Sequence, residues 1–105
     1  MTNFSDMLSK AKDMQDKMKE AQEKIKQIEV TGEAGGDLVK VILTGDYDLK
    51  SIIISDKAKN EDQEIINDLI KAAYNNAKEN LKKKSAEELS KVTGGLNLPP
   101  DFKLP

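Results

Sequence analysis

The chain has 105 residues, enough for one small domain with a modest core and too few for two. It contains no cysteine and no histidine, which excludes a disulfide framework, a thiolate nucleophile and the commonest metal ligands and general bases. Its basic residues are all lysines, and the net charge is −2. No signal-peptide core or run of ~18 apolar residues is present, so we expect a cytoplasmic, non-catalytic domain without membrane contact, cofactor or small-molecule substrate.

A heptad repeat dominates the first quarter of the chain. From Lys10 onward the sequence reads KAKDMQD, KMKEAQE and KIKQIE. Apolar side chains recur at alternating spacings of three and four residues, at Phe4, Met7, Ala11, Met14, Met18, Ala21, Ile25 and Ile28. This spacing predicts one long helix over residues 5–29 with a single apolar stripe along it.

The next segment changes to a period of two, which is typical of strands. Turn-forming residues separate the apolar runs and predict strands over residues 28–31, 38–44 and 49–55. The middle strand places Val39, Val41 and Leu43 on one face. Connections this short give antiparallel hairpins, and a small sheet with one apolar face needs helices to cover it.

A second amphipathic helix follows the strands. Asn60 and Gln63 suit the start of a helix. An apolar face then recurs at helical spacing, at Ile66, Ile70, Ala73, Ala77 and Leu81. Ser85 and Glu88 resemble a capping box, so the stretch as far as Val92 is either a continuation or a separate helix.

These elements predict an α+β fold with two layers in the order α-β-β-β-α and a three-stranded antiparallel sheet. We place one domain at residues 1–93 and a glycine- and proline-containing tail at 94–105. A helix of about 25 residues is ~37 Å long, whereas the strands span only about 20 to 24 Å. The sheet cannot cover the whole stripe, so we expect a homodimer. Its candidate interface is Met7, Ala11, Met14, Met18, Ala21 and Ile25.

Two groups of residues have both a chemical and a structural interpretation. Acids gather at Asp56, Glu61, Asp62 and Glu64, where a helix start favours negative charge and no nucleophile or metal-ligand partner accompanies them. The glycines at 32, 35 and 36 lack the Gly-Lys-Ser/Thr ending of a phosphate-binding loop, so they indicate a hairpin turn. We predict neither a catalytic residue nor a metal site.

Lysines recur on both predicted helices. Lys71, Asn75, Lys78 and Lys82 form one polar stripe, which Lys83 and Lys84 extend. Two lysine rows on the first helix lie on either side of acids. The charge pattern alone favours a solvated helix surface whose charges pair with one another. A dimer would double each row, which leaves weak, salt-sensitive phosphate binding open.

Several segments together resemble the YbaB/EbfC family of small bacterial nucleoid-associated DNA-binding proteins. The resemblance covers nearly the whole chain and begins with the first helix, rich in methionine and lysine, leading into IEVTGE at 28–33. It continues with LVKV at 38–41, Gly45 and AAYNNA at 72–77. GLNLPPDFK at 95–103 is its most specific part.

The resemblance implies a homodimer with helices projecting like tweezers. It also implies loose, largely sequence-independent binding of double-stranded DNA, a place in the nucleoid, and a role in nucleoid organisation and gene expression. The family's DNA contacts fall on both helical regions. The corresponding candidates here are Lys12, Lys19, Lys26, Lys71, Lys78, Lys82, Lys83 and Lys84. Absence of arginine argues against reading of base edges.

A competing hypothesis is a non-catalytic protein-interaction module. It would use the methionine-rich heptad helix and the apolar tail, in which we expect partial docking of Leu96, Leu98, Phe102 and Leu104 onto the domain. Ile42 and Ile53 fall on the sheet face opposite Val41, and they are more apolar than a solvated face needs. They mark either a dimer contact or a partner surface.

Overall fold

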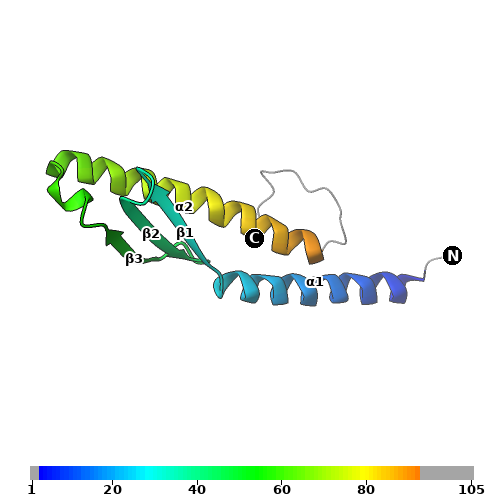
Figure 1. Cartoon of the computed structure of the whole chain (residues 1–105). Helices are drawn as coiled ribbons and strands as arrows, with labels where there is room; N and C mark the ends of the chain where they lie inside the picture. The colour runs from blue at the N-terminus through cyan, green and yellow to red at the C-terminus, as the bar shows by residue number, and fades with distance from the viewer. Residues whose placement is uncertain (1–2, 93–105) are drawn as a thin grey trace.

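The computed structural model describes residues 3–92, and the predicted tail at 94–105 lies outside this part (Figure 1). The elements are α1 Phe4–Lys26, β1 Glu29–Ala34, β2 Val39–Thr44, β3 Leu49–Ile54, the short 3-10 helix η1 Ala58–Asn60 and α2 Gln63–Val92. Their order, with one three-stranded antiparallel sheet, confirms the predicted α+β fold.

The sheet has the order β1-β2-β3, and α2 lies across β1 and β2 (Figure 1). Val39, Val41 and Leu43 of the central strand are fully buried beneath the helix, as their alternation predicted. The helix side of this core consists of residues from the predicted apolar face, chiefly Ala73, Ala77 and Leu81. The core therefore lies in one layer between α2 and two of the three strands.

The packing of α2 on β1 is unusually close at Gly32. A Cβ atom on Gly32 would lie 2.1 Å from the carbonyl oxygen of Ala73 and 2.3 Å from the amide nitrogen of Ala77. Two asparagines of α2 also satisfy the outer backbone groups of β1. Asn76 Oδ1 accepts from Glu33 N at 3.0 Å, and Asn80 Nδ2 donates to Thr31 O at 2.9 Å. The helix thus occupies the edge of β1 where another strand would otherwise pair.

Helix α1 extends away from the sheet (Figure 1). Its start is capped by Asn3, whose side chain accepts from Ser5 N at 3.0 Å. Its last turn packs on the β2–β3 turn, where a Cβ on Gly45 would come within 1.6 Å of the Ile25 carbonyl oxygen. The molecule measures 70 × 21 × 18 Å, and its radius of gyration is 19.0 Å, against ~13 Å for a compact domain of this length.

Several details refine the sequence-based prediction, and α1 ends at Lys26 rather than at residue 29. Strand β1 continues through Ala34, so Gly32 lies within the strand and only Gly35 and Gly36, with φ of 63° and 71°, form the turn. Helix α2 runs without a break through Ser85 to Val92, which decides between the two alternatives for this stretch. The 3-10 helix η1 was not anticipated. At Gly32 the contact with α2, which is distant in sequence, outweighs the local preference of glycine for turns.

We expect Gly32→Ala to lower the free energy of unfolding by at least about 3 kcal/mol, because the new methyl group would collide with the backbone of α2. Urea denaturation followed by circular dichroism measures this change.

Gly36→Ala is the matched control. Nothing lies within 4 Å of a Cβ at Gly36, and its φ of 71° imposes only a local strain, so we expect a loss of about 1 kcal/mol. Equal losses for the two variants would contradict the close approach of α2 to β1.

Candidate functional site

Charge is divided unequally between the helices and the sheet with its connections. Residues 27–70, which include the sheet, its turns and the first turns of α2, carry four lysines and ten acids, a net charge of −6. Residues 4–26 and 71–92, which form α1 and the rest of α2, carry twelve lysines and eight acids, a net charge of +4. An overall acidic chain therefore presents two net-basic helical segments, 4–26 and 71–92, which we call the arms, and a net-acidic segment, 27–70, which we call the sheet end. The first part of the α2 arm lies across the sheet, and its last turns meet α1.

A row of lysines follows one side of α2. Lys71, Lys78 and Lys82 are separated by seven and four residues, which keeps their side chains on one flank of the helix. All three are exposed, and Asn75 lies between them. We call Lys71, Lys78 and Lys82 the α2 lysine row. It spans eleven residues, or ~16 Å of helix.

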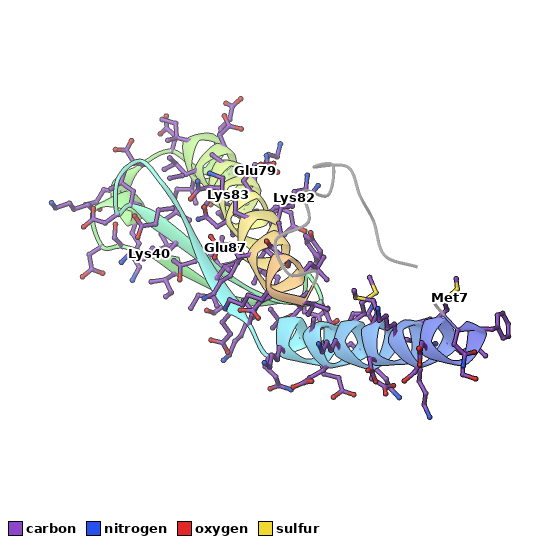
Figure 2. All side chains as sticks on the ribbon, turned by 90° about the vertical axis from the view of Figure 1, so that its right-hand side faces the viewer. Met7, Lys40, Glu79, Lys82, Lys83 and Glu87 are labelled. Atoms are coloured by element: carbon purple, nitrogen blue, oxygen red, sulfur yellow. The ribbon has the colours of Figure 1, made fainter. Side chains whose placement is uncertain are left out.

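The continuous helix separates Lys83 and Lys84 from this row. Each residue turns the direction of the side chain by about 100°, so neither residue extends the row as the sequence-based interpretation held. Figure 2 labels Lys82 and Lys83 with Glu79 and Glu87 near them on the helix. Lys83 and Lys84 remain exposed, but their side chains point away from the side of α2 that carries the row.

The candidate lysines of α1 share one flank of their helix. Lys12, Lys19 and Lys26 recur every seven residues and are exposed. Asp16 and Glu23 lie on the adjoining side, four residues after Lys12 and Lys19. The structure also leaves Lys10 and Lys17 exposed on the other flank of the apolar stripe, which the candidate set did not include. The seven-residue spacing of Lys10 and Lys17 in the sequence could have identified them.

Ion pairing leaves most of the candidate lysines available. Among residues 3–92, Lys82 is the one candidate in an ion pair, with Glu79 at 3.7 Å and both side chains more than half exposed. The other paired lysines are Lys24, Lys40, Lys50, Lys59 and Lys91. Three of these five lie on the acidic sheet end. Most lysines on the helical arms are therefore free to meet an external anion.

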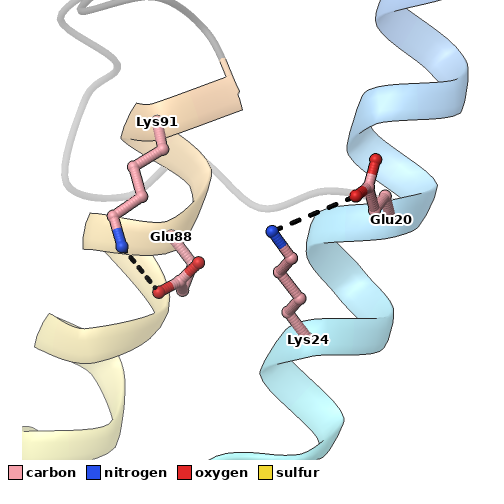
Figure 3. A network of polar contacts seen from close by, with 4 residues as sticks. All are labelled: Glu20, Lys24, Glu88 and Lys91. Atoms are coloured by element: carbon pink, nitrogen blue, oxygen red, sulfur yellow. Dashed lines mark hydrogen bonds and ion pairs between the residues drawn. The ribbon is translucent and has the colours of Figure 1, made fainter.

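The two arms meet where the end of α2 packs on the second half of α1. Residues from both helices line a small cleft there, with Lys17, Ala21 and Lys24 from α1 and Glu88, Lys91 and Val92 from α2 among them. Lys24 pairs with Glu20 at 4.0 Å and Lys91 with Glu88 at 3.0 Å, each within its own helix (Figure 3). These pairs face one another across the junction; the Glu88 side chain is only 20% exposed, whereas the other three are well exposed.

The predicted dimer stripe on α1 is divided by this junction. Ala21 is 2% exposed and packs within the chain, so it is not available to a partner. Met18 and Ile25 are half-buried. Beyond the junction the stripe remains open at Phe4, Met7, Leu8, Ala11 and Met14.

A second apolar surface lies at the edge strand β3, which α2 does not cover. Leu49 and Ile52 are 48% and 41% exposed although they pair with the buried residues Leu43 and Val41. A groove of 330 Å³ lies beside Leu49 and is also lined by Val41 and, from α2, by Ile70, Lys71, Tyr74 and Asn75. Sequence reasoning missed this surface because β3 reads as a buried strand. Its exposure depends on where α2 lies.

Other sites receive no support in the described part of the chain. The acids at 56 and 61–64 surround η1 and the start of α2, and no group of three or more metal-ligating side chains is present among the residues described. None of the described helices is both long and apolar enough to cross a membrane.

Comparison with known proteins identifies the family. A model of the YbaB/EbfC DNA-binding family matches residues 1–96. The chain belongs to the YbaB/EbfC DNA-binding family. This confirms the resemblance inferred from the sequence and places the chain in a class defined by DNA binding rather than by an enzymatic reaction.

Family members of similar length are close in sequence. A nucleoid-associated protein of Hahella chejuensis is 38% identical over 98% of this chain and 95% of its own length. A nucleoid-associated protein of Paramagnetospirillum magneticum is 44% identical over 100% of this chain and 99% of its own. An uncharacterized protein of Helicobacter pylori shares the fold, with a TM-score of 0.72 and 22% identity over 90% of this chain and 100% of that one.

Proposed function

We propose that this chain is a homodimeric, nucleoid-associated protein that binds double-stranded DNA through lysine–phosphate contacts and so influences nucleoid organisation and gene expression. The observation that carries the proposal is the separation of charge, with a net +4 on the helical arms and −6 on the sheet end. An acidic protein would otherwise be repelled by DNA. With this separation the duplex lies along the exposed lysines of α1 and α2 rather than on the acidic loops and strands.

The chemistry of the arms favours loose sequence preference. A lysine ammonium is a point charge that meets phosphate without a fixed geometry, and the chain has no arginine to bind a guanine edge in two places. The α2 lysine row covers ~16 Å, the rise of about five base pairs. A few phosphates neutralised by each arm then give weak binding that depends strongly on salt.

We place the dimer contact at β3 rather than along the whole α1 stripe. Asn76 and Asn80 close the outer edge of β1, whereas β3 has a free edge beside the apolar groove. A second copy related by a twofold axis would bring the same apolar surface, including Leu49 and Ile52, against it. The two pairs of arms would then project from a shared centre and double the number of lysines.

A protein-interaction module is the second candidate. The exposed apolar side chains on the projecting half of α1 favour it, since Phe4, Met7 and Leu8 are all more than half exposed. A gel shift with duplex DNA across a range of salt separates the two. DNA binding predicts a shift that fades steeply as salt rises, and the interaction module predicts no shift at low salt.

Lys78→Gln combined with Lys82→Gln should weaken DNA binding alike for all sequences, because two charges leave the α2 lysine row while helix propensity is kept. The slope of log affinity against log salt should become shallower by roughly 0.9 for each phosphate that the variant no longer neutralises. Fluorescence anisotropy with two unrelated duplexes at several salt concentrations measures both quantities.

Lys50→Gln combined with Lys59→Gln is the matched control, since it removes two charges from the acidic end and should leave affinity nearly unchanged. Lys12→Gln with Lys19→Gln should cause a smaller loss than the α2 pair, because Asp16 lies beside them. Equal losses from all three pairs would indicate a response to net charge alone. A loss confined to one duplex would instead require base readout.

Ile52→Lys should shift the protein from dimer to monomer in sedimentation velocity, since it places a charge in the proposed contact. Ile53→Lys is the matched control: Ile53 is the next residue, similarly exposed, and faces the other side of the sheet. If Ile53→Lys dissociates the dimer and Ile52→Lys does not, the contact lies on the outer face of the sheet.

A further inference from the structure

The projecting half of α1 carries an apolar stripe that the described residues do not cover. Phe4, Met7 and Leu8 are 72%, 57% and 56% exposed, and Met14 is 37% exposed. Met7 lies far along the helix from the sheet and from α2 (Figure 2). The stripe begins where α2 ends, because Val92 lines the same cleft as Lys17 and Ala21.

The chain itself supplies a segment that starts at this place. Helix α2 ends at Val92, and thirteen residues follow it in the sequence. The distance from Lys17 to Phe4 along α1 is thirteen residues, or ~20 Å. Thirteen residues of extended chain reach ~43 Å, so the tail can cover the whole stripe with slack for bends at its glycines and prolines.

The composition of the tail matches this surface. Leu96, Leu98, Phe102 and Leu104 are apolar, and the tail contains one acid and one lysine, so it adds no net charge beside the lysines of α1. Gly94 and Gly95 are the second and third residues after Val92, and glycine permits a change of direction there. A tethered segment also meets its site at an effective concentration in the millimolar range, which a free partner rarely reaches.

We propose that residues 94–105 bind along the exposed stripe of α1 in the same chain, antiparallel to that helix, with Leu98 near Met7. In this proposal the tail is a strap: it shields the apolar stripe from water and limits the motion of the projecting half of α1. Because the stripe adjoins the row formed by Lys12 and Lys19, the strap also fixes the direction of these lysines. The inference does not depend on DNA binding, and it is distinct from the dimer contact at β3.

Disulfide trapping suits this chain because it contains no cysteine of its own. In the full chain carrying Met7→Cys and Leu98→Cys, mild oxidation at low micromolar concentration should form an intramolecular link, since the proposal brings the two Cα atoms within bonding range. The control carries Ser9→Cys with Leu98→Cys. Ser9 is exposed, only two residues from Met7, and points to the opposite side of α1.

The Met7 pair should link on the order of tenfold faster than the Ser9 pair, and the product should keep the mass of one chain on a denaturing, non-reducing gel. Equal rates for the two pairs overturn the proposal, because they reflect the tether alone. A link mainly between two chains, scored by mixing copies of different mass, also overturns it and assigns the stripe to a second copy.

Hydrogen exchange provides a second measurement that needs no cysteine. A stop codon after Thr93 should speed amide exchange several-fold in residues 4–14 and leave residues 73–81 in the core of α2 unchanged. Leu98→Asn with Phe102→Asn should have the same effect while keeping the length of the chain. Exchange in residues 4–14 that is unchanged in both variants overturns the proposal.

Discussion

The contact between α2 and β1 determines how the other elements are arranged. At Gly32 the backbone of the helix lies so near the strand that no side chain fits between them. Ala73 and Ala77, the buried helix residues at this contact, have small side chains that allow the close approach. Asn76 and Asn80 then satisfy the backbone groups along the edge of the strand. Because α2 is continuous, fixing it over β1 also fixes where its last turns meet α1.

This placement leaves β3 uncovered, while α1 extends away from the sheet and only the last turns of α2 reach it (Figure 1). An uncovered edge strand with Leu49 and Ile52 exposed leaves apolar surface in water, and we propose a second copy of the chain as its partner. The arms carry a net charge of +4 and the sheet end a net charge of −6. A long molecule keeps these charges apart, and a compact one of the same composition would not. Membership of a DNA-binding family accords with this separation.

The apolar stripe of α1 divides at its junction with α2. Near the sheet, Ala21 packs within the chain. Beyond the junction, Met7 and Met14 remain open, and we assign them to the tail of the same chain. A strap of this kind suits a projecting helix, because the described residues leave the first half of α1 exposed and do little to limit its fraying. One heptad pattern thus serves two different contacts.

The sequence by itself determined the elements, their order and the buried face of β2, because the periods of helices and strands are local properties that Val39, Val41 and Leu43 report directly. It also indicated the family from the order of its segments. Only the tertiary structure decided that Gly32 lies inside a strand and that Ile52 is exposed, since both depend on where α2 rests. The structure also brings together the two net-basic segments, 4–26 and 71–92, which are distant in the sequence and meet where the end of α2 packs on α1.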